Sequence, residues 1–452
     1  MPNEPSAALS SLDTPIQAIY QNLKTNWQSN NNSWKVANSF DTMLDYLRYL
    51  YDTNNPNAQA ESAWVLGQAQ EKWSSAQGSL CWYDDHGWWG ISCGKAFDPD
   101  YQAVFANASS VQDFRELAVD RWKVMNSGKD ANCHLGGPNV WDNRCCCGGT
   151  KKPTVCFDDP NDKNNWAKPL FPGGVWQYDM FKEGRPQVHC DENPMNPFET
   201  QLGPFQNTVM NGLYFVLAQQ MAAYKKSNPN DPLFSGLNLE AAIASEYGFL
   251  DQWFKYPDKD NGLLCVLSDN TAMVRERAGV YAKLADGSYP SVNGFDSEQG
   301  WAGDQGLMLG GLCLYALTQP NGNDARTYAN WLAAGMSDPN GLFWDTAADY
   351  IQPCTPTWLP NDMPDYISGV GVFFRYLMQV CMLPDNPIAA TVNTPAFHTF
   401  LNRCTTVAAN PNHLVRWEQY KEGDGDEQEW MTFVWFNRLA ILLSAVRILS
   451  KT

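Results

Sequence analysis

Apolar side chains recur at helical spacing through most of the chain, and the apolar-polar alternation typical of strands is scarce. Twelve segments place their apolar residues three or four positions apart, so each would present an apolar face as a helix. The pattern predicts an all-α protein. The segments are residues 16–27, 34–51, 60–73, 84–97, 111–125, 205–224, 237–254, 301–317, 324–336, 366–381, 394–408 and 429–449.

These segments alternate in character along the chain. Every second one is rich in glycine, small residues and aromatic rings and is apolar nearly all round, whereas its neighbours are amphipathic. A helix that is apolar on every side is buried. Six buried helices alternating with six covering helices predict an (α/α)6 barrel, a toroid of helical hairpins. The predicted inner helices begin near residues 34, 84, 205, 301, 366 and 429.

The stretch 127–204 interrupts the helical pattern and is rich in Cys, Gly, Pro and Asp. We interpret it as an irregular insertion in one barrel domain that spans residues 1–452, because loops this long are usually functional or disordered. Disulfide bridges of a secreted protein and reduced thiols of an intracellular protein both fit its cysteines. A metal cluster fits less well, because no CxxC pair is present. The cysteines concerned are Cys133, Cys145, Cys146, Cys147, Cys156 and Cys190.

The composition limits the classes of partner. A formal net charge of −18 repels phosphates and anionic lipids, so neither nucleic acid nor a membrane surface is an expected partner. No run approaches the ~18 apolar residues of a membrane-spanning helix. The first residues lack the basic start and apolar run of a signal peptide, so we expect a cytoplasmic protein if Met1 is the native start, or a secreted one if a signal was removed.

Residues 81–90, CWYDDHGWWG, place Asp84 and Asp85 side by side at the start of a predicted inner helix. Adjacent acids at this position can simply cap the helix. Their position and surroundings also fit a sugar-cleaving site, because an inner helix faces the barrel axis and sugar rings stack on aromatic side chains. The aromatic neighbours are Tyr83, Trp88 and Trp89.

Two carboxyl groups are what cleavage of a glycosidic bond requires, one as an acid and one as a nucleophile or base. The chain offers no GxSxG, HExxH or glycine-rich phosphate loop as a competing catalytic motif. Nothing in the sequence predicts a bound metal ion or cofactor. The sequence therefore favours a glycosidase with Asp84 and Asp85 as its catalytic pair.

The stretch YDDHGWWG resembles the signature of glycoside hydrolase family 76, the endo-α-1,6-mannanases. Five further stretches are similar to motifs of that family, in the same order: SWKVANSFDTMLDYL, PGGVWQ, FQNTVMNGLYFVLA, WAGDQGLMLGGL and SGVGVFFRYL. The resemblance implies an (α/α)6 barrel and a retaining hydrolase of α-mannan, with Asp84 as nucleophile and Asp85 as acid/base. The chain departs from the family motifs at Gln177, Gln206, Gly212 and Gly369 or Val370, so its sugar can differ.

Further residues are predicted to contact an oligo- or polysaccharide substrate, although each also has a structural interpretation as a cap or a packing residue. Two rings lie in the insertion, two asparagines lie one turn apart on an inner helix, and three residues open another inner helix. A sugar-binding protein without hydrolytic activity, or a hydrolase of a different glycan, remain as alternative functions on the same toroid. The predicted contacts are Trp176, Tyr178, Asn207, Asn211, Trp301, Asp304 and Gln305.

Overall fold

The computed structural model describes ten ranges of the chain, and it confirms all twelve predicted helices. Most of the predicted insertion at 127–204 lies outside these ranges, so the division into one domain with an insertion stays a prediction. The described residues are 11–31, 33–76, 83–129, 174–175, 207–255, 264–268, 270–276, 300–338, 368–410 and 427–450.

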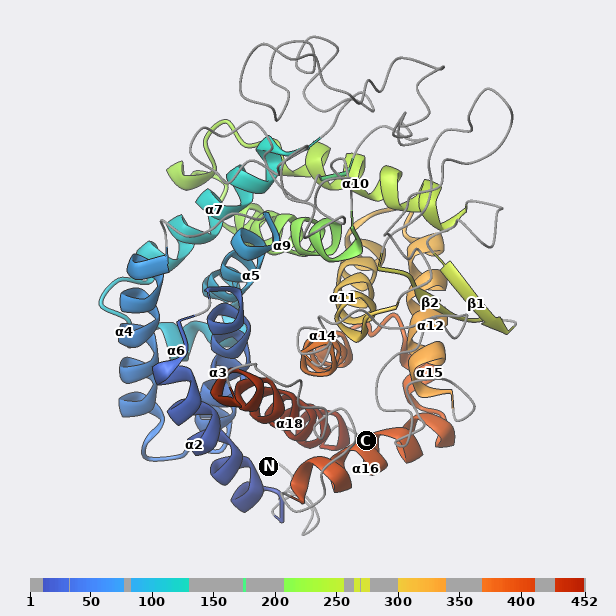
Figure 1. The fold of residues 1–452 in the computed structure, drawn as a ribbon. Coiled ribbons are helices and arrows are strands. Elements are labelled where there is room, and N and C mark those ends of the chain that lie inside the picture. Colours follow the sequence, from blue (N-terminus) through green and yellow to red (C-terminus); the bar gives the residue numbers. More distant parts are fainter. Residues whose placement is uncertain are drawn as a thin grey trace, which may run out of the picture.

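The six predicted inner helices form a closed ring, in which each helix packs against the next and the last returns to the first (Figure 1). Their buried residues surround the whole helix, as the apolar sequences predict. In chain order they are α3 (Ser33–Asp52), α5 (Tyr83–Gly94), α9 (Thr208–Ser227), α11 (Ala302–Thr318), α14 (Gly369–Met382) and α18 (Glu427–Leu449).

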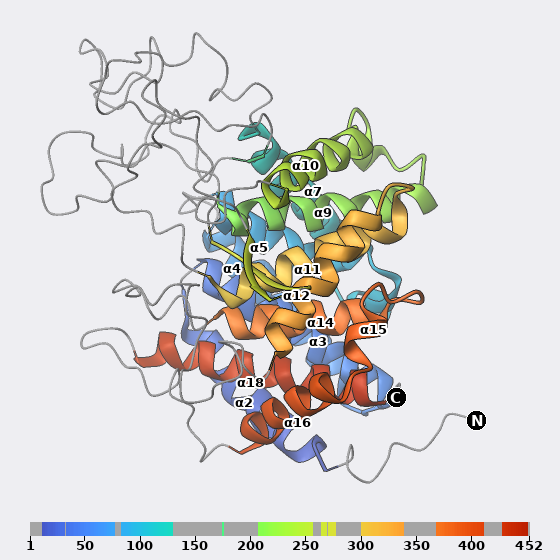
Figure 2. The ribbon, with the colours of Figure 1, turned by 90° about the vertical axis from the view of Figure 1, so that its right-hand side faces the viewer.

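The six amphipathic helices cover this ring from outside (Figures 1 and 2). Helix α7 is typical, since it buries Phe114, Ala118 and Trp122 on one face and exposes the other. The alternation of inner and outer helices along the chain is therefore confirmed. The outer helices are α2 (Asp13–Ser29), α4 (Ala58–Ala76), α7 (Val111–Ser127), α10 (Leu239–Phe254), α12 (Asn323–Ser337) and α16 (Pro395–Ala409).

Glycines allow the inner helices to approach closely. A Cβ atom at Gly306 of α11 would lie 2.6 Å from the backbone Cα of Phe373 in α14. At Gly212 of α9, where the resembled family has a glutamate, a Cβ would lie 2.8 Å from Leu307. Any side chain at these positions would push the helices apart, so the glycines of the inner segments serve packing.

A short antiparallel hairpin between α10 and α11 was not predicted. Strand β1 (Leu264–Ser268) pairs with β2 (Thr271–Val274), from Leu264 opposite Val274 to Ser268 opposite Thr271, with a bulge between Val266 and Ser268. Asn270 in the turn has a positive φ of 65°, a conformation that asparagine tolerates better than most residues. Strands of four and five residues carry too little alternation to be recognised.

Smaller helical elements connect the main ones. They are η1 (Lys95–Phe97), η2 (Pro99–Tyr101), α6 (Gln102–Phe105), η3 (Pro232–Phe234) and α15 (Ala389–Val392).

Helix α18 has a stretch, Met431–Leu449, that is long and apolar enough to cross a membrane by length and composition alone. Most of that stretch is buried inside the barrel, as expected for an inner helix of this ring. Among the described cysteines, Cys93, Cys313 and Cys404 carry free thiols. The six cysteines at 133–190 lie outside the described residues.

Candidate active site

The N-terminal ends of the inner helices meet at one end of the barrel, which we call the N-terminal end. Trp89 of α5 donates from Nε1 to Ser33 Oγ at the start of α3 (3.0 Å). Trp88 of α5 meets Trp301, the residue that precedes α11, edge to face at 6.0 Å. Gly369 at the start of α14 lies against the same ring, because a Cβ there would be 2.4 Å from Trp301 Nε1.

This arrangement favours negative charge at the N-terminal end. Each helix leaves backbone N–H groups unbonded in its first turn and carries a partial positive charge there. Asp84 and Asp85 lie in the first turn of α5, and Asp304 lies in the first turn of α11. The acidic side chains of these first turns therefore lie where the helix ends carry partial positive charge.

Asp84 and Asp85 are both partly buried, and Asp84 Oδ1 accepts a hydrogen bond from the backbone N–H of Asp85 (3.1 Å). Tyr83, the first residue of α5, is buried and its ring lies directly over Gly128, where a Cβ would come within 2.3 Å of it. The Tyr83 hydroxyl is 3.5 Å from Ser127 Oγ. Tyr83 thus fixes the start of α5 against the end of α7, which sets the position of the two carboxyl groups.

One face of α5 is turned to the barrel interior, and Trp88 lies on it. Residues three and four apart lie on one helix face, so Trp88 follows both Asp84 and Asp85 along the same side. Trp88 contacts Trp301, and Lys95, seven residues further, contacts α3 inside the barrel. Trp88 therefore lies on the interior side, and the placement of the two carboxyl groups beside it stays a prediction from the helical spacing.

The other side chains of this stretch turn away from the interior. His86 is buried, with Nδ1 2.8 Å from Nη1 of Arg121 on the outer helix α7. Because a guanidinium can only donate, Nδ1 is the acceptor in this contact. Trp89 is fully buried and packs edge-on against Trp73 of α4 at 5.3 Å, which gives it a packing role in this structure.

The predicted asparagine and glutamine contacts are buried and bind the backbone. Asn207 is the N-cap of α9, because that helix begins at Thr208, and its Oδ1 accepts from the Met210 N–H (2.9 Å). Asn211 and Gln305 are fully buried and hydrogen-bond to segments that precede α9 and α11. Asp304 is fully buried in the first turn of α11. The last two predicted contacts, Trp176 and Tyr178, lie outside the described residues.

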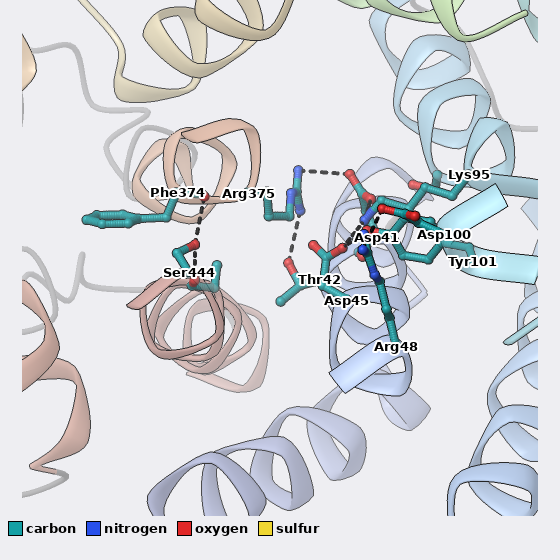
Figure 3. A network of polar contacts seen from close by, with 12 residues as sticks. Asp41, Thr42, Asp45, Arg48, Lys95, Asp100, Tyr101, Phe374, Arg375 and Ser444 are labelled. Atoms are coloured by element: carbon teal, nitrogen blue, oxygen red, sulfur yellow. Dashed lines mark hydrogen bonds and ion pairs between the residues drawn. The ribbon is translucent and has the colours of Figure 1, made fainter. Parts of the chain in front are cut away.

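A buried charge network, formed by Asp41, Asp45, Lys95 and Arg375, fills the interior deeper in the barrel (Figure 3). Lys95 Nζ contacts Asp41 and lies 2.7 Å from Asp45 Oδ1. Arg375 reaches from α14 to α3, past the intervening α18, and places Nη2 3.3 Å from Asp41 Oδ2. Its Nη1 also donates to Thr42 Oγ1 (3.0 Å). Paired charges therefore occupy the barrel interior at this level.

Burial alone would raise the pKa of Asp41, but the charges of Arg375 and Lys95 and the Lys95 hydrogen bond outweigh it and hold that pKa below its usual value. The sequence does indicate that such a network exists, because Asp41, Asp45, Lys95 and Arg375 all lie within segments that are predicted to be buried on every side. Buried charges are expected to be paired. The sequence pattern gave no means of telling which charges would pair.

Comparison with known proteins identifies the fold. No protein-family model and no curated protein matches the chain. Among solved structures, the chain is similar to the GH76A α-1,6-mannanase from Salegentibacter sp. HEL1_6, with a TM-score of 0.53 and 14% identity over 95% of this chain and 99% of that chain. At this identity the likeness establishes a shared fold, so the predicted (α/α)6 barrel is confirmed, and the resemblance to family 76 is confirmed at the level of the fold.

Two further similar structures are inactive variants of the same Salegentibacter enzyme. One has two adjacent aspartates changed to asparagine and is in complex with α-1,6-mannotriose (TM-score 0.52, 14% identity, 95% of this chain and 99% of that chain). The other has two adjacent aspartates changed to alanine and is in complex with α-1,6-mannotetrose (TM-score 0.50, 14% identity, 95% and 99%).

Proposed function

We propose that this protein is a retaining glycoside hydrolase that cleaves α-1,6-mannan or a related α-mannoside, with Asp84 and Asp85 as its catalytic pair. The observation that carries the proposal is that two adjacent aspartates, Asp84 and Asp85, lie in the first turn of the inner helix α5, close to Trp88 and Trp301. The same fold supports an α-1,6-mannanase whose inactive variants have two adjacent aspartates replaced.

The proposed reaction has two steps. The Asp84 carboxylate attacks the anomeric carbon while the glycosidic C–O bond breaks, and the proton of Asp85 passes to the leaving oxygen. Water then attacks the glycosyl-enzyme, Asp85 takes its proton, and the bond to Asp84 breaks with overall retention of configuration.

The substrate class follows from charge and shape. The chain has a net charge of −18, which suits a neutral glycan better than an anionic one. Trp88 and Trp301 lie near the pair, and we propose that rings at this end contact sugar, with Trp176 and Tyr178 of the insertion as further candidates. Because the charge network fills the deeper interior, the glycan would lie across the N-terminal end instead of threading the barrel.

The roles of the two aspartates are tested with substrates of different leaving-group acidity. An Asp85→Asn variant should lose activity on α-1,6-mannan by about 100-fold or more, yet keep the first step for an aryl α-1,6-mannobioside, whose leaving group needs little protonation. An Asp84→Asn variant should lose both activities. Proton NMR of the first product should show the α-anomer, and a β-anomer would contradict the retaining mechanism.

The same assays separate hydrolysis from binding alone. Wild-type protein that binds α-1,6-mannotetraose but releases no product after long incubation would be a sugar-binding protein on this toroid. Activity on another α-glycan, lost in Asp84→Asn, would retain the proposed mechanism and correct the proposed sugar.

A further inference from the structure

Asn211 on α9 hydrogen-bonds through both polar atoms of its side-chain amide to the backbone of Val175, which precedes the helix in the chain. Its Oδ1 accepts from the Val175 N–H (2.7 Å), and its Nδ2 donates to the Val175 carbonyl (3.4 Å). The same Nδ2 donates to the carbonyl of the N-cap residue, Asn207 (2.7 Å). Both Asn211 and Val175 are fully buried, so these bonds are made away from water.

Gln305 on the neighbouring inner helix α11 makes the same set of bonds. Its Oε1 accepts from the Val274 N–H (2.7 Å), and its Nε2 donates to the Val274 carbonyl (2.7 Å) and to the carbonyl of Trp301 (3.0 Å). Trp301 is the N-cap residue of α11, so Gln305 and Asn211 each stand four residues after their N-cap. The arrangement therefore occurs at the same position of two adjacent helices.

The first turn of α9 holds the second segment as well. The Thr208 N–H donates to the Glu276 carbonyl (2.7 Å), and Thr208 Oγ1 donates to the Arg275 carbonyl (2.5 Å). These bonds satisfy a backbone N–H that the start of a helix would otherwise leave without a partner. The start of α9 thus binds both segments, 174–175 through Asn211 and 271–276 through Thr208.

The segment that Asn211 holds also reaches the helix that carries the aspartates. Lys129 pairs with Val175 in an antiparallel bridge, and its Nζ lies 3.3 Å from Glu246 of α10. Gly128, the residue before Lys129, lies under the ring of Tyr83 at the start of α5. A continuous set of contacts therefore joins Asn211 to the first turn of α5.

We propose that Asn211 and Gln305 are positioning residues, which hold the two extended segments at the N-terminal end of the barrel so that the glycan site is formed. They act through the backbone of Val175 and Val274 and do not touch the sugar, since their amides are occupied and buried. The kinetic consequence rests on the proposed function, whereas the holding of the segments does not.

Amide hydrogen exchange and steady-state kinetics test the proposal together. We expect Asn211→Ala to raise the exchange rate of the Val175 amide by about tenfold or more, the value of one lost hydrogen bond, and to leave Val274 protected. The same variant should raise KM for α-1,6-mannotetraose by about tenfold while kcat stays within about threefold. Gln305→Ala should expose Val274 and spare Val175.

Gln219→Ala is the matched control, because Gln219 is also a buried amide of α9 but binds the carbonyls of Phe215 and Gly311 inside the barrel. It should change neither the exchange of Val175 nor KM. If Asn211→Ala does not fold, Asn211→Leu is the second variant: leucine is similar in size but can neither accept from the Val175 N–H nor donate, so it should show the same effects.

Unchanged exchange of Val175 in a folded Asn211 variant would overturn the proposal. Faster exchange with unchanged KM and kcat would overturn the positioning role. A wild-type protein inactive on every glycan would refute the proposed function, while the exchange of Val175 would still decide whether Asn211 holds the segment.

Discussion

Replacing Lys95 with methionine tests the physical account of the barrel interior. Lys95 is 2% exposed, contacts both Asp41 and Asp45, and donates to the Asp41 carbonyl (2.9 Å). Methionine keeps a long flexible side chain of similar volume but removes the charge and the donors. The substitution therefore leaves two buried carboxylates with one cation, Arg375.

The expected cost is large. Asp41 keeps its ion pair with Arg375 at 3.3 Å, but Asp45 is left with the hydroxyl of Tyr101 as its hydrogen-bond donor among the contacts described here. Removing one partner of a buried ion pair costs about 3–5 kcal/mol, because the remaining charge has lost its water and its counter-ion. With an unfolding entropy of about 2 cal/mol/K per residue, this lowers Tm by about 3–5 °C for a chain of this length.

Differential scanning calorimetry at neutral pH measures the shift. Lys123→Met is the matched control, since Lys123 is half-exposed and 3.7 Å from Asp120, and such surface pairs contribute less than about 1 kcal/mol. Adding Asp45→Leu to Lys95→Met removes the stranded carboxylate and should restore part of the lost Tm. A Lys95→Met protein that melts within about 1 °C of wild type would refute the reasoning.

Three further predictions concern stability and reactivity. The pKa of Asp41 is lower in the folded protein than in the unfolded chain, so the Asp41 carboxylate should stabilise the fold fully above about pH 4 and progressively less below it. The Tm of Asp41→Asn should therefore fall less steeply than the wild-type Tm as the pH is lowered below about 4. Gly306→Ala should cost about 1–3 kcal/mol in urea unfolding by crowding α14, whereas Gly67→Ala, with no atom within 4 Å, should stabilise α4 by about 0.5–1 kcal/mol. Burial raises the pKa of Cys93 well above its usual value, so mass spectrometry should find this fully buried thiol unalkylated at pH 7 until the protein unfolds, and rapid labelling of folded protein would contradict this.

The helices could be predicted because burial leaves a direct trace in the sequence. The inner helices are apolar all round and the outer helices are not, and this difference alone places each helix in the ring. Helix ends are predicted less accurately. The sequence predicts a helix from residue 205, whereas α9 begins at Thr208, so Asn207 is the N-cap and not a residue inside the helix. The Asp pair stands out as a candidate because it opens a helix whose burial the apolar pattern predicts.

Contacts between distant parts of the chain could not be predicted in this way. Nothing in the spacing of Asn211 or Gln305 shows that a valine backbone will occupy its amide, so the sequence leaves open both a sugar contact and a structural role for each residue. The pairing of Arg375 with Asp41 across the barrel depends on the ring of helices and not on any local pattern. Tertiary partners decide whether a buried polar residue serves the fold or a ligand.

The most direct test of the proposed function compares the release of reducing ends from α-1,6-mannan by wild type, Asp84→Asn and Asp113→Asn. Asp113→Asn is the matched control. Asp113 is exposed in the first turn of the outer helix α7, so this variant replaces an aspartate at a similar helix position that lies away from the barrel interior. We expect release by wild type and Asp113→Asn, and a loss of at least about 100-fold in Asp84→Asn at unchanged Tm. Equal release by Asp84→Asn would contradict the assignment of the catalytic pair.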